Sequence, residues 1–219
     1  MPFYAKKPDH LPPPGAKDYD WRGLSPAELE RARKAWLRRV TFFIGQLPAE
    51  LSRNRKSRVL YVGCAFGALQ RIWVDLGYES VIGIEWDAPR AVYARAYGCD
   101  VLVADYRRLP FPDRSFDLAI FDRVIQPGLN YAGPGDLGDV LRICRDRAAV
   151  FFLFHLNWSP QDVDRLKGPG WDLHWGIQKQ GLVHATLYRG CTLDAPADRR
   201  SWPRIVARTR HRLRALRKR

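Results

Sequence analysis

The sequence predicts an α/β domain in which a mostly parallel sheet of seven strands carries helices on both faces. From Arg58 onward, short apolar runs alternate with segments of helical periodicity, a pattern typical of βαβ units. The chain has 219 residues, close to one large domain on the usual scale of roughly 100–200 residues. The 27% charged fraction and eight Trp exclude a disordered chain, so we expect a single core with short additions at its ends.

The first predicted helix precedes this alternation. Residues 1–24 are rich in Pro, Gly and charge, and we expect an extended arm there. Ser25-Pro26-Ala27-Glu28 then forms a capping box with Pro at the first helical position. Apolar residues follow at helical spacing, which predicts a helix that packs on the core and turns its arginines outward: Leu29, Ala32, Trp36, Val40, Phe43 and Leu47.

The alternating region gives the remaining elements in order. We expect five strands, at 58–62, 80–84, 100–103, 116–121 and 148–154. Helices are expected near 67–76, 88–97, 136–145 and 160–167. Asp87 and Pro89 are suited to begin the second of these helices, and Gly98 to end it. Two more strand-like segments, 171–179 and 182–189, surround Gln180-Gly181 and predict a hairpin with an antiparallel strand at the edge of the sheet.

The formal net charge of +14 lies entirely in the two ends of the chain. Residues 1–57, the arm and its helix, hold twelve Lys and Arg against six Asp and Glu. Residues 58–190, the predicted α/β domain, hold fifteen of each, and residues 191–219 hold ten against two. A neutral domain indicates a substrate of no particular charge, whereas the basic ends could attract phosphates or anionic lipid head groups.

The basic tail, residues 191–219, has a thin apolar stripe between its arginines, which is typical of a basic amphipathic helix. Such a helix would contact RNA or an anionic membrane surface, or would dock on its own domain. No apolar run approaches the roughly 20 residues of a membrane span, and the N-terminus lacks the apolar core of a signal peptide. We therefore expect a cytoplasmic protein. The four cysteines are far apart, which indicates reduced thiols and no metal site.

The chemistry is expected where the first strand turns into a helix. Val59 to Gly67 reads as a buried strand followed by a turn of small residues, which lets a nucleotide-like ligand approach the backbone. Glu85 ends the second strand 18 residues after Gly67, close to the spacing of roughly 20 for an acid that accepts protons from ribose hydroxyls. Nicotinamide enzymes share these two features.

A third feature of the sequence argues against a nicotinamide enzyme. An acid, Asp105, follows the third strand, and a Pro-rich loop and Ser115-Phe116-Asp117 then lead into the fourth strand, which ends at Phe121. Together with the turn and Glu85, this order resembles the class I S-adenosylmethionine-dependent methyltransferases, particularly the group that contains many small-molecule methyltransferases. The resemblance covers about residues 58–190 and implies a Rossmann-like fold.

The resemblance also implies a set of cofactor contacts. S-adenosylmethionine is the implied cofactor and S-adenosylhomocysteine its product. The turn would flank the methionine and ribose, Glu85 would bind the ribose hydroxyls, and Asp105 would bind the adenine amine. The implied cofactor-binding residues are Tyr61, Gly63, Cys64, Ala65, Gly67, Glu85, Trp86, Asp105, Tyr106 and Phe121. Two of them depart from the family pattern, since Tyr61 stands where an acid is usual and Ala65 where a glycine is usual.

Methyl transfer needs an acceptor held in line with the sulfonium, so positioning supplies most of the acceleration and a catalytic acid or base is not required. Asp122, after the fourth strand, and His155, after the fifth, are the candidates for such a group. A His at the end of an apolar strand also commonly only caps it. Asn130 and Tyr131 belong to a Gly- and Pro-rich loop directly after the fourth strand and are candidate substrate contacts.

The leading hypothesis is a methyltransferase that acts on a small or medium-sized acceptor through oxygen or nitrogen. The basic ends favour an alternative, an RNA or ribosome-associated methyltransferase. The departures at Tyr61 and Ala65 favour another, a non-catalytic scaffold that binds the cofactor. A nicotinamide oxidoreductase is the weakest alternative, because it gives the segment from Asp105 to Phe121 no role.

Overall fold

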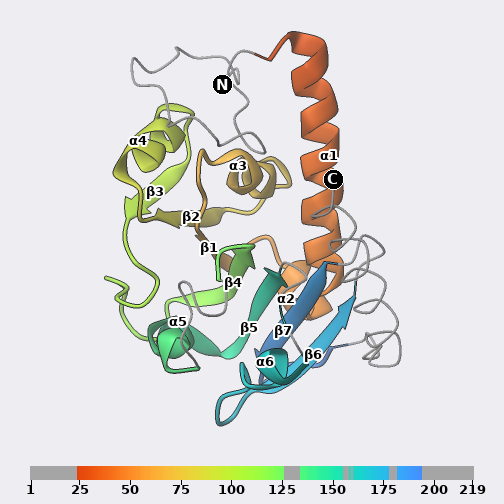
Figure 1. Ribbon diagram of the computed structural model, residues 1–219, viewed down its shortest axis with the longest axis vertical. Coiled ribbons are helices and arrows are strands. Elements are labelled where there is room, and N and C mark those ends of the chain that lie inside the picture. The colour runs from red at the N-terminus through yellow and green to blue at the C-terminus, as the bar shows by residue number, and fades with distance from the viewer. Residues whose placement is uncertain (1–23, 126–133, 155–157, 159, 178–181, 194–219) are drawn as a thin grey trace, which may run out of the picture.

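The computed structural model describes residues 24–125, 134–154, 158, 160–177 and 182–193. Within these ranges one sheet of seven strands has the order β3-β2-β1-β4-β5-β7-β6 (Figure 1). The strands are β1 Arg58–Val62, β2 Ser80–Glu85, β3 Asp100–Val103, β4 Phe116–Asp122, β5 Cys144–Phe154, β6 Asp172–Ile177 and β7 Val183–Arg189. The helices are α1 Pro26–Gly45, α2 Ala49–Ser52, α3 Ala68–Asp75, α4 Ala88–Ala96, the short 3-10 turn Pro134–Leu137, α5 Gly138–Ile143 and α6 Pro160–Asp164.

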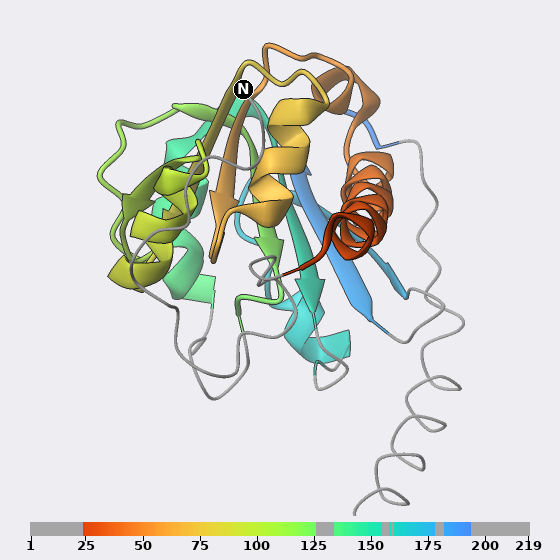
Figure 2. The ribbon, with the colours of Figure 1, turned by 90° about the horizontal axis from the view of Figure 1, so that it is seen from above.

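The sheet reverses its direction of growth at β1. From β1 the chain adds β2 and β3 on one side and β4 and β5 on the other, all in parallel. In Figure 2 the arrows of β1, β4 and β5 end along one side of the sheet, which we call the carboxyl edge. Ligands of open α/β sheets bind outside this edge at the point where the strand order reverses, which here lies between β1 and β4.

The antiparallel strand is confirmed, but it is not the edge strand. β7 runs antiparallel to β5 and lies between β5 and β6, so that β6 forms the edge. The predicted helix 136–145 is also too long, because pairing of Cys144 with Phe116 begins β5 immediately after Ile143. Similarly, α6 ends at Asp164 instead of 167, and the short α2 was not predicted.

Two apolar cores lie on the two faces of the sheet. The residues of each strand alternate between them, as a pleated strand requires. Tyr61 and Ile120, for example, face the core that α1, α3 and α4 cover. Phe121 and Phe152 face the opposite core, under α5 and α6. The near-continuous apolar strands of the sequence are therefore the consequence of burial on both faces.

Helix α1 begins as predicted. The Ser25 hydroxyl accepts from Glu28 N at 3.4 Å, and the Glu28 carboxylate accepts from Ser25 N at 2.8 Å. Its apolar stripe packs on the first core, and Arg33 forms an ion pair of 3.1 Å with Asp75 of α3. Among the described residues, no helix combines the length and the apolar character that crossing a membrane requires.

Candidate functional site at the carboxyl edge

The loop between β1 and α3 needs backbone conformations that favour glycine. Gly63 and Gly67 have φ values of +65° and +80°, and Ala65 between them has φ +48°. A Cβ atom at Gly63 would lie 2.5 Å from Cγ2 of Val124, and one at Gly67 would lie 2.6 Å from Sγ of Cys99. The small residues thus let this loop pack closely against Val124 and Cys99 of its own domain.

Glu85 lies directly beside this loop. Its side chain is buried, with 3% of the residue exposed. Its Oε2 accepts from Ala65 N at 2.8 Å, and its Oε1 accepts from Asp87 N at 3.1 Å. The carboxylate therefore ties the loop after β1 to the turn after β2, at the edge where the sequence predicted a ribose contact.

An exposed aromatic ring and an accessible carboxylate stand next to Glu85. Trp86 is 77% exposed, which is unusual for so large an apolar side chain. The carboxylate of Asp105, after β3, is 40% exposed and forms an ion pair of 2.5 Å with Arg107. Hydrogen bonds from Arg107 lower the pKa of Asp105, so this carboxylate is ionised and acts as a hydrogen-bond acceptor near neutral pH. A flat ring and an acceptor of this kind suit a purine base.

Three other residues of the predicted cofactor set, Phe121, Tyr106 and Cys64, are buried near this edge. Phe121 is fully buried, and its ring stacks on Phe152 at 5.0 Å and meets Tyr106 edge-on at 5.6 Å. Burial raises the pKa of Tyr106 to about 12. The Cys64 thiol is also buried, which raises its pKa. Phe121 and Tyr106 belong to one core and Cys64 to the other, so they pack on opposite faces of the sheet.

Tyr61 and Asp122 meet across the boundary between β1 and β4. The Tyr61 hydroxyl donates to Asp122 Oδ2 at 3.4 Å, and Nη2 of Arg39 in α1 donates to Asp122 Oδ1. Arg123 Nε lies 3.6 Å from the same Oδ1. Burial raises the pKa of Asp122 despite the opposing charge of Arg39, and burial followed by the Asp122 charge raises the pKa of Tyr61. Arg39, Arg123 and Tyr61 hold this buried carboxylate in place, so this geometry favours a positioning role for Asp122.

Sequence reasoning missed Arg39, which reaches the site from a helix outside the predicted α/β domain. No local pattern distinguishes it from the other arginines of α1. Three predicted residues, His155, Asn130 and Tyr131, lie outside the described residues.

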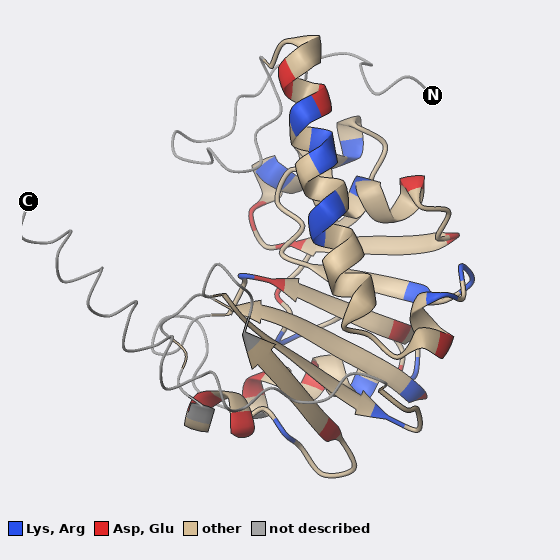
Figure 3. Ribbon diagram, turned by 90° about the vertical axis from the view of Figure 1, so that its right-hand side faces the viewer, with Lys and Arg blue, Asp and Glu red and all other residues tan. Residues whose placement is uncertain are grey.

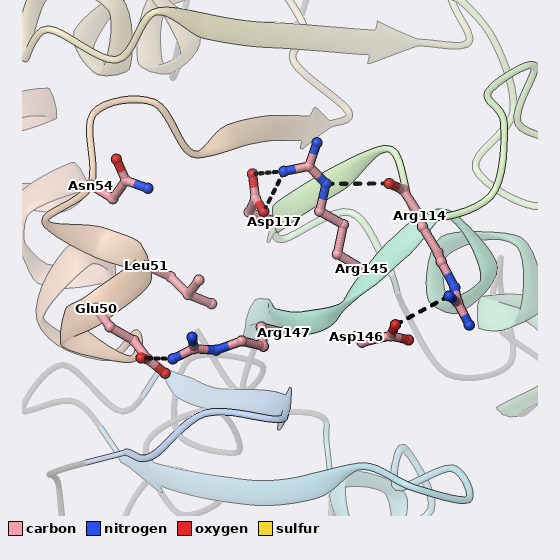
Figure 4. Close-up of a pocket in the computed structure, with 8 residues that line it drawn as sticks. All are labelled: Glu50, Leu51, Asn54, Arg114, Asp117, Arg145, Asp146 and Arg147. Atoms are coloured by element: carbon pink, nitrogen blue, oxygen red, sulfur yellow. Dashed lines mark hydrogen bonds and ion pairs between the residues drawn. The ribbon is translucent and has the colours of Figure 1, made fainter.

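A hollow of about 600 Å³ lies at the opposite edge of the sheet, between α2 and the first residues of β4 and β5 (Figure 4). Each arginine in its wall pairs with a carboxylate: Arg145 with Asp117 at 3.0 Å, Arg114 with Asp146 at 3.2 Å, and Arg147 with Glu50. The charges in this hollow are balanced, and the hollow lies away from the carboxyl edge. It therefore does not support the nucleotide-like ligand site predicted from the sequence.

The part of the chain that matches a known family model includes the carboxyl edge. Residues 60–127, which run from β1 past the end of β4, match the family model of a methyltransferase domain. A curated relative, "Probable tRNA methyltransferase 9B" of Bos taurus, is 33% identical over 92 residues. That alignment covers 42% of this chain but only 18% of the bovine protein, so the similarity concerns one part of a much longer chain.

Solved structures share the fold at low sequence identity. The PH0226 protein of Pyrococcus horikoshii superposes with a TM-score of 0.57 at 16% identity, covering 74% of this chain and 92% of that one. A SAM-dependent methyltransferase of Methanosarcina mazei superposes with a TM-score of 0.52, also at 16% identity, covering 64% and 95%. The order of elements around the carboxyl edge is therefore found in other proteins.

Proposed function

We infer that this chain, which carries a class I methyltransferase domain, is an S-adenosylmethionine-dependent methyltransferase whose acceptor is a small or medium-sized molecule methylated on oxygen or nitrogen. The observation that carries the inference is the position of Glu85. Its buried carboxylate ends β2 at the carboxyl edge and accepts from Ala65 N of the loop after β1, which the family model includes. The equal numbers of basic and acidic residues in 58–190 favour an acceptor that does not depend on charge.

The residues of the carboxyl edge fit the chemical groups of this cofactor. Glu85 would accept from the ribose hydroxyls, Asp105 would accept from the adenine amine, and Trp86 would cover the base. The cofactor supplies a methyl group on a sulfonium, ready for transfer to a nucleophile. The protein then contributes mainly by fixing the distance and the angle of approach, which supplies a large share of the rate without a proton transfer.

Titration calorimetry of the full chain with S-adenosylmethionine, S-adenosylhomocysteine and NAD tests this function. We expect both adenosyl ligands to bind and NAD not to bind. Loss of charged hydrogen bonds in Glu85→Ala should weaken binding roughly 10- to 100-fold, since such bonds contribute about 1.5–3 kcal/mol. Glu79→Ala is the matched control, because Glu79 is exposed and precedes the opposite end of the same strand.

The outcomes separate the alternatives. If neither adenosyl ligand binds the wild type, the proposed function is wrong. Binding of NAD instead would identify a nicotinamide protein. If Glu85→Ala and Glu79→Ala bind equally well, the cofactor does not use Glu85. Once binding is established, transfer of a radiolabelled methyl group to candidate acceptors distinguishes an enzyme from a scaffold that only binds the cofactor.

A second candidate function, methylation of RNA, is favoured by the surface of α1. Arg31, Lys34 and Arg38 are all exposed, and at about 100° per residue they fall within roughly 60° of one another, opposite the buried stripe. Figure 3 shows this basic face on successive turns of α1. Because the apolar face of α1 is buried in the core, the exposed face is suited to phosphates and unsuited to a lipid bilayer. The similarity to the bovine tRNA methyltransferase also supports this candidate.

Anisotropy of labelled single-stranded RNA at two salt concentrations tests the second candidate. An interface that includes α1 predicts salt-sensitive binding, and the variant with Arg31, Lys34 and Arg38 all changed to Gln should reduce the slope of log K against log salt by about 2, at roughly 0.7 per phosphate contact. A slope unchanged by the triple variant would rule out α1. Deletion of 191–219 measures the separate contribution of the basic tail.

A further inference from the structure

The hollow between α2 and the first residues of β4 and β5 lies at the edge of the sheet opposite the carboxyl edge, and we call it the amino-edge hollow. Its volume of about 600 Å³ lies within the roughly 300–1,000 Å³ of sites that hold small molecules. The proposed methyl transfer does not use it. Apart from Leu51, every residue that lines it is charged or carries an amide. A ligand of this hollow would therefore be polar or charged.

The loop between α2 and β1, residues 53–58, adds positive charge beside this balanced wall. Four of its six residues are Lys or Arg. Arg53 and Lys56 are exposed and form no ion pair with the residues that the structure describes. The acid next to the loop is Glu79, whose backbone N donates to Arg55 O at 2.9 Å. With Glu79 counted, the wall and the loop hold seven basic residues against four acidic ones, an excess of three positive charges.

Arg145 and Arg147 extend from the start of β5 along the side of the hollow that faces α2 (Figure 4). Asp117 holds Arg145 in place: its Oδ1 accepts from Arg145 Nη1 at 3.0 Å, and its Oδ2 also accepts from Arg58 N at 2.7 Å. Nη2 of Arg145 and Nη1 of Arg147 form no hydrogen bond with the described residues. One nitrogen of each guanidinium group can therefore donate to a ligand.

The ion pair between Arg147 and Glu50 is easily exchanged for a ligand. Its two side chains are 66% and 37% exposed, and exposed ion pairs contribute little to stability. A phosphate group carries more negative charge than a carboxylate and accepts from a guanidinium group in the same two-bond geometry. It can replace Glu50 on Arg147 while Asp117 keeps Arg145 in position.

We propose that the amino-edge hollow binds the phosphate group of a small phosphorylated molecule, with Arg145 and Arg147 as donors and the loop 53–58 as the surrounding positive charge. This site is separate from the proposed cofactor site and goes beyond the proposed function. A small molecule fits the hollow better than an RNA backbone. The exposed carboxylates of Glu50 and Asp146 flank the two arginines and would repel a long run of phosphates.

Titration calorimetry of the full chain with inorganic pyrophosphate at low salt tests the site. We expect one site per chain with a Kd below about 1 mM. Arg147→Gln should weaken binding roughly tenfold, because hydrogen bonds between charged groups are lost. Glu50→Gln should tighten binding about two- to fivefold, since it removes the carboxylate that competes for Arg147. Because the two variants shift the affinity in opposite directions, misfolding cannot account for both.

Arg165→Gln is the matched control, since it removes the same charge from a side chain that is 72% exposed and does not line the hollow. It should keep the wild-type affinity, and a loss equal to that of Arg147→Gln would overturn the proposal by showing attraction to net charge alone. The proposal is also overturned if the wild type does not bind pyrophosphate, or if Arg147→Gln and Glu50→Gln leave its affinity unchanged. A short single-stranded RNA distinguishes the source of the phosphate. RNA binding that Arg147→Gln abolishes, without any binding of pyrophosphate, would replace the small molecule by an RNA backbone.

Discussion

Replacement of His184 by leucine should reduce the acid sensitivity of this fold between pH 7.5 and pH 5. His184 lies on β7 beneath α1, where its ring meets Phe42 edge-on at 5.3 Å and stacks on Phe151 at 6.3 Å. It is 6% exposed, and His174 is the titratable group that faces it, with ring centroids 6.2 Å apart. Burial, followed by the charge of His174, lowers the pKa of His184 to about 4.

The direction of this pH dependence of stability follows from proton binding. An unfolded histidine titrates near pH 6.5, so between pH 6.5 and 4 the unfolded chain binds a proton that native His184 does not. The stability that neutral His184 provides is fully present above pH 6.5, falls progressively below pH 6.5, and is lost once the pH has fallen through 4. At about 1.36 kcal/mol per pKa unit, the loss between pH 7.5 and pH 5 amounts to about 2 kcal/mol.

Urea unfolding of wild type and His184→Leu at pH 7.5 and pH 5 measures this effect. Contributions from groups that do not interact with His184 cancel in the difference between the two proteins, so that difference, which includes the His174 coupling, should change by about 2 kcal/mol in favour of the variant at pH 5. Leucine has a similar volume and carries no proton, and any loss of ring packing is the same at both pH values. A difference that does not change with pH would show that His184 is not buried in its neutral form.

Three other substitutions test the geometry of the site and of the helix above it. Gly63→Ala should destabilise the protein by about 1–3 kcal/mol, because the added Cβ would contact Val124. The further change Val124→Ala should recover part of this loss. Equal urea midpoints for Gly63→Ala and the wild type would contradict the contact. Ala65→Gly should raise the free energy of unfolding by about 1 kcal/mol, because glycine adopts a φ of +48° without strain. A lower urea midpoint for the variant than for the wild type would show that the loop is unstrained. Thr186→Val should cost about 1 kcal/mol by thermal unfolding, since the buried hydroxyl donates to Gln46 O at 2.9 Å; an unchanged melting temperature would count against that bond.

The strands and the start of α1 were predictable because their signals are local. Apolar runs between turn residues located all seven strands, and the capping box located the first turn of α1. The boundary between α5 and β5 was not predictable from local signals, since Cys144 leaves the helix in order to pair with Phe116, which is 28 residues away in the chain. The place of β7 inside the sheet has the same cause, because it depends on pairing with β5.

The residues of the candidate site also divide into those with a local signal in the sequence and those without one. Glu85, Asp105 and the loop at 63–67 could be found from the sequence, since each follows a strand at a characteristic spacing and parallel strands bring their carboxyl ends to one edge. The partners of these groups could not be found from the sequence. That Ala65 N donates to Glu85, and that Arg39 reaches Asp122 from 83 residues away, depends on how α1 and the loops pack on the finished sheet. Periodicity and capping act over a few residues of chain, whereas ion pairs act through space, so the sequence determined where the edge would form and only the tertiary structure decided which charges meet there.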